Sequence, residues 1–165
     1  MRRPQFAVLA LLVIACIQML YFNHAIDKAI VAAHFNVPGD PNGWQTKQSF
    51  FSLYVLLLVL GLTLSFGLPF LFSRIPARYM NLPNSDFWLA PERRALTLRR
   101  MADEFAWLGA ATVLLVLVEM QITLSANLSL NPHVEPLGVI VPLGCYLAFA
   151  VWWFVRFLQG FSRPR

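Results

Sequence analysis

The sequence predicts an all-α membrane protein: four transmembrane helices with an ordered external loop and a cytoplasmic loop containing an amphipathic helix. The first observation is composition, because 58% of the 165 residues are hydrophobic and only 13% are charged. Soluble domains are about 45–50% apolar and about 25% charged. The second is a set of four apolar runs, each near the ~20 residues that a spanning helix needs. The runs lack the alternation of a membrane β-barrel. We expect one domain over residues 1–165.

We place the spans at residues 5–23, 50–72, 105–125 and 137–158. A helix satisfies its own backbone hydrogen bonds, so it is the element expected inside hydrocarbon. The first run could also be a cleaved signal peptide. Its apolar sequence continues past Cys16, so we expect it to remain as a span. Cys16 and Cys145 lie inside apolar runs, and we interpret them as small core residues rather than a disulfide or a zinc site.

Arginine is unevenly distributed between the predicted loops, and this asymmetry predicts the orientation. The arginines of the chain ends and the second loop are Arg2, Arg3, Arg74, Arg78, Arg93, Arg94, Arg99, Arg100, Arg156, Arg163 and Arg165. The first loop carries only Lys28 and Lys47, and the third carries neither lysine nor arginine. We therefore predict cytoplasmic termini, a cytoplasmic second loop, and external first and third loops. The net charge of +5 follows from this orientation, so we expect a lipid bilayer and no nucleic acid as partner.

The first external loop combines a helical pattern with strong turn signals. The apolar positions at helical spacing are Ile26, Ile30, Ala33 and Val37. They predict an amphipathic segment on the membrane surface. Two turns should follow, around Gly39 and Gly43, because Pro38-Gly39 and Asn42-Gly43 are turn-forming pairs. We expect Phe35 and Trp44 to pack together or onto the outer helix ends, which would make the loop an ordered cap.

All three histidines fall on the predicted outer side, together with three carboxylates. These residues are His24, His34, His133, Asp27, Asp40 and Glu135. A histidine and carboxylate metal site is one interpretation. The spacings match no compact ligand motif, so the other interpretation is that His34 hydrogen-bonds within the loop. We expect no metal or other cofactor.

The second loop begins with turn residues and continues as a helix. Pro91 suits the first turn of a helix, and Glu92 complements its N-terminal dipole. The arginines that follow should face the cytoplasmic leaflet, where they would orient the chain and contact anionic lipid. The alternative is a docking site for a cytosolic protein.

Two motifs resemble segments of a known family. "HFNVPGDPNGW" followed by Lys47 resembles the first segment of a small bacterial membrane domain of unknown function, and "NLPNSDFWLAPERR" resembles its second segment. The matching residues of the external motif are His34, Phe35, Gly39, Pro41, Gly43, Trp44 and Lys47. Those of the cytoplasmic motif are Asn81, Pro83, Asn84, Trp88, Pro91, Glu92 and Arg93.

The same domain forms the N-terminal part of immunity proteins against the Sdp killing toxin. Those proteins protect the cell from a secreted toxin and can hold a transcriptional repressor at the membrane. The resemblance implies a bacterial cytoplasmic membrane protein whose partners are a secreted peptide or a cytoplasmic protein. Sdp immunity proteins carry a further C-terminal membrane region, which we expect this chain to lack. The usual Leu-Pro before the histidine is replaced here by AIDKAIVAA.

Glu119 is the one acidic residue inside a predicted span, and such residues are functional candidates by default. At about 1.5 Å per residue it lies ~21 Å along the third span. Gln18, Tyr54 and Tyr146 lie at similar depths, so we expect Glu119 to point into the bundle and meet one of them. A protonated, hydrogen-bonded acid is one interpretation, and a ligand or proton site is the other.

We expect a non-enzymatic membrane protein that binds or senses an external ligand or toxin and relays this to a cytoplasmic partner. The sequence contains no nucleophile and base pair and no phosphate-cradling glycine loop. The alternatives are a small transporter or channel subunit that uses Glu119, and a membrane metal protein that uses the external histidines. Small-residue faces at Gly61 and Ser65, or at Ala106 and Ala110, could assemble further helices. The sequence leaves the oligomeric state open.

Overall fold

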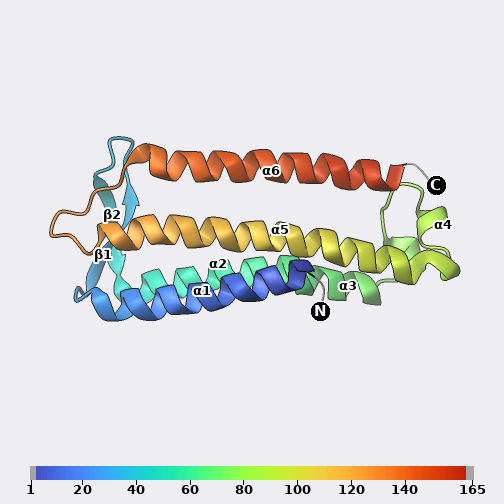
Figure 1. Cartoon of the computed structure of the whole chain (residues 1–165), viewed down its shortest axis with the longest axis horizontal. Helices are drawn as coiled ribbons and strands as arrows, with labels where there is room; N and C mark the ends of the chain where they lie inside the picture. Colours follow the sequence, from blue (N-terminus) through green and yellow to red (C-terminus); the bar gives the residue numbers. More distant parts are fainter. Residues whose placement is uncertain (1–2, 163–165) are drawn as a thin grey trace.

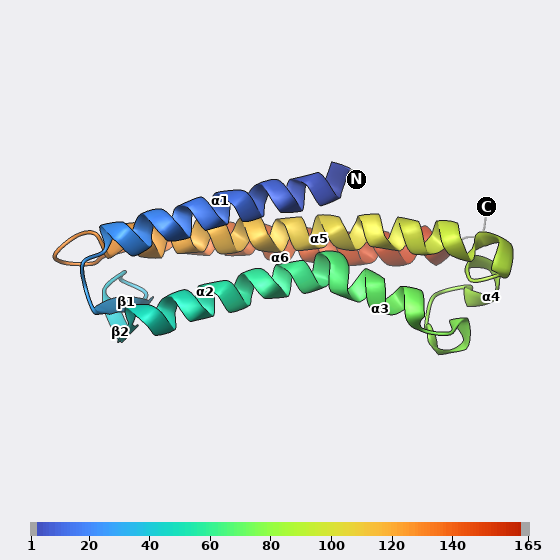
Figure 2. The ribbon, with the colours of Figure 1, turned by 90° about the horizontal axis from the view of Figure 1, so that it is seen from below.

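The computed structural model describes residues 3–162, which form an elongated bundle of long helices (Figures 1 and 2). Within this part of the chain, four continuous helical stretches are long and apolar enough to cross a membrane. They are α1 (Arg3–Ala25), the stretch α2 (Lys47–Leu62), η1 (Thr63–Gly67) and α3 (Leu68–Arg74), then α5 (Pro91–Ala126) and α6 (Pro136–Ser162). Each stretch contains one of the four spans predicted from hydropathy, so the prediction of four such helices is confirmed.

Helix α5 lies at the centre of the bundle. It packs against α1, against the α2, η1 and α3 stretch, and against α6, whereas α1 and α2 hardly touch one another (Figures 1 and 2). Its buried side chains are correspondingly distributed along most of its length. In contrast, Trp153 and Phe161 are the buried residues of α6, so most of that helix lies on the outside of the bundle.

Small residues let α5 and the α2 stretch approach closely. A Cβ atom added to Gly109 would lie 1.9 Å from the Ser65 hydroxyl and 2.7 Å from the carbonyl oxygen of Gly61. Ser65 is buried and donates its hydroxyl hydrogen to the same Gly61 carbonyl at 2.8 Å. Ala106 and Ala110 are also buried. The sequence suggested that these small-residue faces could bind further helices. In the structure they pack within the chain, at the crossing of α5 and the α2 stretch.

The α2 stretch widens and bends at this crossing. Residues of η1 form a single π-helical turn, in which the Leu68 amide donates to the Thr63 carbonyl five residues earlier. Pro69 lacks the N–H that would reach the carbonyl of Ser65, so the α-helical ladder is interrupted here. The direction of the helix changes at this point (Figure 2).

The loop between α1 and α2 is a β-hairpin, not the amphipathic surface helix expected for its first half. Strand β1 (Ile30–Phe35) pairs antiparallel with β2 (Pro41–Thr46). Val31 and Ala32 are buried at the end of the bundle. The apolar spacing was misleading because a segment this short is stabilised by strand pairing and by burial of adjacent residues, which helical periodicity does not describe.

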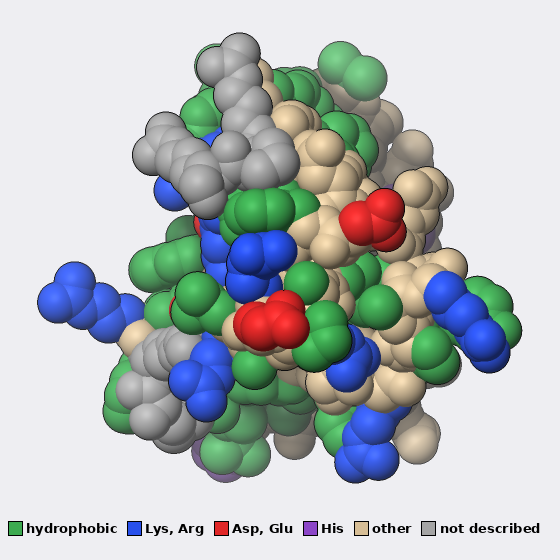
Figure 3. All heavy atoms as spheres, turned by 90° about the vertical axis from the view of Figure 1, so that its right-hand side faces the viewer, with side chains coloured by type: hydrophobic (Ala, Val, Ile, Leu, Met, Phe, Trp, Pro, Cys, Tyr) green, Lys and Arg blue, Asp and Glu red, His purple; other side chains and the backbone are tan. Residues whose placement is uncertain are grey.

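The opposite end of the bundle holds short helical turns and most of the arginines. The 3-10 turn η2 (Ala77–Tyr79) and helix α4 (Ser85–Trp88) connect α3 to α5. The amphipathic helix expected in this loop is the first part of α5 and continues without a break into the apolar span. Lysine and arginine side chains spread over this end, with few acidic ones (Figure 3).

Enlarging Gly109 should separate the helices at their closest crossing. We expect Gly109→Ala to lower the free energy of unfolding by about 1–3 kcal/mol, because the new methyl group meets Ser65 and a backbone carbonyl that cannot retreat. Unfolding in mixed micelles with increasing SDS measures the change. Gly144→Ala is the matched control, since nothing lies within 4 Å of its added Cβ. Equal stability of the two variants would contradict the close crossing.

Candidate functional site

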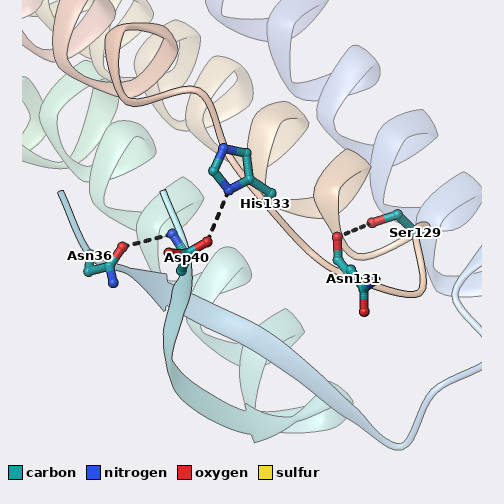
Figure 4. A network of polar contacts seen from close by, with 5 residues as sticks. All are labelled: Asn36, Asp40, Ser129, Asn131 and His133. Carbon is teal, nitrogen blue, oxygen red and sulfur yellow. Dashed lines mark hydrogen bonds and ion pairs between the residues drawn. The ribbon is translucent and has the colours of Figure 1, made fainter. Parts of the chain in front are cut away.

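The tip of the hairpin is an ordered turn built from residues 36–40. The Asn36 amide donates to the Asp40 carbonyl at 2.9 Å, and the Asp40 amide donates to the Asn36 side chain at 2.7 Å (Figure 4). Gly39 has φ of +97°, a conformation that glycine adopts without the cost paid by other residues. The turn predicted around Gly39 is therefore present. The second turn, predicted around Gly43, is not formed, because Asn42 and Gly43 lie inside strand β2, where Gly43 pairs with His34.

This tip docks against the loop that joins α5 to α6. The Val134 amide donates to the Gly39 carbonyl at 3.0 Å. A Cβ atom on Gly39 would lie 2.0 Å from the Val134 carbonyl oxygen. His133 Nδ1 lies 3.3 Å from Asp40 Oδ1, with both side chains more than half exposed (Figure 4). Glycine is thus required at position 39 both by the backbone conformation and by the closeness of the loop between α5 and α6.

Asn127 fastens the outer edge of β1 to the end of α5. Its side-chain oxygen accepts from the Ala32 amide at 2.8 Å, and its side-chain nitrogen donates to the Ala32 carbonyl at 2.8 Å. The same nitrogen donates to the Thr123 carbonyl in the last turn of α5. Asn127 is 1% exposed and Ala32 is fully buried, so these bonds satisfy strand-edge groups that water does not reach. Asn127 belongs to neither sequence motif and was not among the expected site residues.

Lys47 ties the start of α2 to the end of α1. Its ammonium group donates to the carbonyl oxygens of Asn23 and Ile26, the latter at 2.7 Å. These carbonyls lie at the C-terminal end of α1, where no further helical N–H is available and a positive charge is favoured. At the start of α2, Thr46 accepts from the Ser49 amide as an N-cap. The lysine of the first motif is therefore a helix-capping residue.

His34 and Trp44 remain on the exposed surface of the hairpin. His34 lies opposite Gly43 in the register and covers it, since a Cβ atom on Gly43 would be 3.0 Å from the His34 side chain. Trp44 lies opposite Ala32 and is 55% exposed. Phe35 is half-buried, and no ring contact joins it to Trp44 among the residues described. Pro41 begins β2 and pairs with Phe35.

The second motif captures the C-terminal end of α6. Asn84 donates from its side-chain nitrogen to the carbonyls of Phe161 and Ser162 at 3.2 and 2.9 Å. The indole nitrogen of Trp88 donates to the Phe161 carbonyl at 2.7 Å. Arg100 donates to the Gly160 carbonyl at 3.2 Å and lies over the Phe161 ring. Three side chains thus satisfy carbonyls that the helix itself leaves unpaired.

The remaining residues of the second motif shape the start of α5. Pro91 is its first residue, and Glu92 is an exposed acid in its first turn. Arg93 donates to the Phe87 carbonyl at 2.7 Å and stacks over the Phe87 ring. Asn81 is exposed and Pro83 is half-buried in the connecting turn. The neighbouring Arg94 donates to the Ile75 carbonyl at the end of α3.

The polar residues inside the spans form two separate groups rather than one cluster around Glu119. Gln18 accepts from the Tyr54 hydroxyl and donates to the Gln121 side chain at 2.7 Å and to the Leu117 carbonyl at 3.2 Å. The Tyr146 and Thr112 hydroxyls are 2.9 Å apart. Gln18 and Tyr54, which were expected to be partners of Glu119, bond to one another instead, and Gln121 joins them although no sequence pattern predicted it.

Glu119 belongs to neither group. Its Oε1 atom is buried and has no hydrogen-bond partner in residues 3–162, so the expected bond to Gln18, Tyr54 or Tyr146 is not formed. The physical reason is angular, because residues two apart on a helix do not face the same neighbour. Gln121 faces Gln18, and Glu119 therefore points away from it.

The histidines do not assemble a metal site. Within residues 3–162, no three histidine, cysteine, aspartate or glutamate side chains are grouped so that they could hold a metal ion. No protein-family model, curated protein or solved structure matches the chain. The geometry of the two ends is therefore the basis for a functional assignment.

Removing the Asn127 side chain should release the hairpin. Asn127→Ala leaves the buried amide and carbonyl of Ala32 without partners, which costs about 1–3 kcal/mol for each group. We expect hydrogen exchange of the Ala32 amide, followed by NMR in micelles, to accelerate at least about tenfold. Asn131→Ala is the control, because Asn131 is an exposed residue of the same loop. Unchanged exchange at Ala32 in Asn127→Ala would contradict the clamp.

Proposed function

We propose that the chain is a non-enzymatic, multi-pass protein of the bacterial cytoplasmic membrane, similar in type to Sdp immunity proteins. Its hairpin recognises a secreted peptide on the external side. The observation that carries this proposal is that some hairpin residues fix its position while others stay exposed and free to contact a ligand. Gly39, Lys47 and the buried strand edge hold it in place, whereas His34 and Trp44 remain exposed.

A peptide is the ligand that the hairpin geometry favours. In residues 3–162 the sheet has only two strands, and Asn127 occupies the outer edge of β1. The outer edge of β2 has no strand beside it, and a free edge accepts an extended peptide through main-chain hydrogen bonds. The exposed indole of Trp44 projects from this strand, and exposed aromatic side chains are frequent anchors in binding surfaces.

Charge supports the proposed orientation. The arginines between residues 74 and 100 gather at the end opposite the hairpin (Figure 3), and such an excess marks the cytoplasmic side. The C-terminal end of α6 lies at that same end, and α1 begins toward it (Figure 1). The arginine end is then the surface available to a cytoplasmic protein partner.

Transport is the second candidate, and one observation favours it. A buried carboxyl oxygen without a partner, as at Glu119, is expensive in a membrane and is often retained for proton or ion movement. Proton flux into liposomes that stops in Glu119→Gln would support this second function over the first.

The recognition proposal is tested in a bacterium sensitive to an Sdp-type peptide toxin. Cells producing the chain should survive the toxin better than cells with empty vector. The double variant His34→Ala and Trp44→Ala should lose this protection at the same protein level, because both side chains are exposed and neither makes a side-chain hydrogen bond within residues 3–162. Val37→Ala, at an exposed position of the tip, is the control that should still protect.

Orientation is checked in the same cells. A cysteine placed at Asn42 of an otherwise cysteine-free chain should react with an impermeant reagent, and one placed at Ser85 should not. Identical killing with and without the chain, in cells where Asn42 is labelled from outside, would overturn peptide recognition. Labelling of Ser85 instead would overturn the orientation.

A further inference from the structure

A groove runs along one side of the interface between α5 and α6. Its first part, of about 280 Å³, is lined by Asp103, Glu104, Trp107, Phe149, Trp152, Trp153 and Arg156. Its second part, of about 330 Å³, is lined by Ala111, Leu114, Leu115, Val118, Pro142, Cys145, Tyr146 and Phe149. Phe149 lines both parts, so the two parts meet at its ring.

Helical periodicity makes the groove continuous. On α5 the lining residues Glu104, Trp107, Ala111, Leu114 and Val118 follow one another at intervals of three or four, which places them on one face. The lining residues of α6 do the same from Pro142 through Phe149 to Arg156. Helix α1 begins alongside the middle of α5, so it does not extend along the α4 end of this face (Figures 1 and 2).

The two parts differ in chemistry. The part nearer α4 carries carboxylates at Asp103 and Glu104, a guanidinium at Arg156 and three indole rings, and Arg156 lies over the Trp152 ring at 5.1 Å. Trp153 donates from its indole to the Glu104 carbonyl at 3.1 Å and holds the helices together here. The other part is lined by aliphatic and aromatic side chains, with the Tyr146 hydroxyl directed to Thr112.

The length of the groove matches one leaflet of a bilayer. At about 1.5 Å per residue, the stretches from Glu104 to Val118 and from Arg156 to Pro142 are each about 21 Å long. A bilayer with its headgroup regions is about 40–45 Å thick, so one leaflet is about 20–22 Å. The charged end lies toward α4, where the arginines mark the membrane surface, and the apolar end lies toward the bundle middle.

We propose that this groove binds one zwitterionic phospholipid. Its phosphate lies against Arg156, its ammonium group lies against Glu104 and the indole faces, and an acyl chain follows Leu114 and Val118. Guanidinium groups bind phosphate through charge-assisted hydrogen bonds, and indole faces attract ammonium groups. An anionic lipid would satisfy Arg156 and leave Glu104 facing a headgroup without positive charge.

Native mass spectrometry of the purified protein with added lipid tests the proposal. We expect phosphatidylethanolamine to be retained roughly tenfold more strongly than phosphatidylglycerol of identical acyl chains, a difference of about 1.4 kcal/mol. Water-soluble glycerophosphoethanolamine should not displace it at equal concentration, because it has no chain for the apolar part. Equal retention of the two phospholipids, or equal displacement by the soluble headgroup, would overturn the proposal.

Variants separate the two ends of the groove. Glu104→Gln should reduce the preference for phosphatidylethanolamine, with the Asp103 carboxylate still present in the lining, and Arg156→Gln should weaken retention of both lipids. Arg74→Gln is the matched control, because Arg74 also lies over a neighbouring ring, that of Phe70, but outside the groove. Glu92→Gln is the acidic control on an exposed turn of the same helix.

A further variant keeps the test decisive if one of the charge variants does not fold. Ala111→Phe should fill the apolar part and reduce retention of both lipids while the preference between them persists. Circular dichroism and SDS unfolding identify any variant that fails to fold. If Glu104→Gln or Arg156→Gln does not fold, the lipid retention of Ala111→Phe decides whether the groove is the lipid site. Full retention in well-folded Ala111→Phe or in Arg156→Gln would refute the groove as the lipid site.

Discussion

The structure depends on satisfying the carbonyl groups at the C-terminal ends of its helices. These groups have no N–H partner within their own helix, so a donor from outside the helix must supply the hydrogen bond. The capping side chains come from elsewhere in the chain or from the residue that ends the helix: Lys47 for α1, Arg94 for α3, Asn127 for α5, and Asn84, Trp88 and Arg100 for α6. Each capping side chain also joins two elements, so the same hydrogen bonds satisfy the helix-end carbonyls and hold neighbouring elements together.

Capping explains why the two sequence motifs lie at opposite ends of the molecule. The first motif closes the end that holds the hairpin, and the second closes the end that holds the arginines. Between them, the central helix α5 supplies a close crossing with the α2 stretch and the groove shared with α6. The exposed hairpin face, the groove and the arginine end are surfaces that these structural contacts leave uncovered.

Hydropathy was sufficient to predict the helices, because an uninterrupted apolar run of this length has few other solutions in lipid. Hydropathy was not sufficient to predict the hairpin. The spacing of Ile26 and Ile30 suggested a helix, whereas the segment forms strand β1, in which the adjacent residues Val31 and Ala32 are both buried. Depth along a span placed Gln18 and Tyr54 at the same level, where they bond to one another rather than to Glu119. It could not give the rotation of α5, which directs Gln121 rather than Glu119 toward Gln18. Side chains that act on distant backbone, such as Asn127, leave no periodic signal.

Replacement of Lys47 tests the capping account most directly. Lys47→Met keeps the length of the side chain and removes the ammonium group that donates to the Asn23 and Ile26 carbonyls. SDS unfolding should show a loss of about 1.5–3 kcal/mol, the contribution of hydrogen bonds from a charged group. Gln48→Met, at the exposed neighbouring position, should change stability by less than about 0.5 kcal/mol. A Lys47→Met protein as stable as the Gln48→Met protein would contradict the claim that helix-end carbonyls organise this fold.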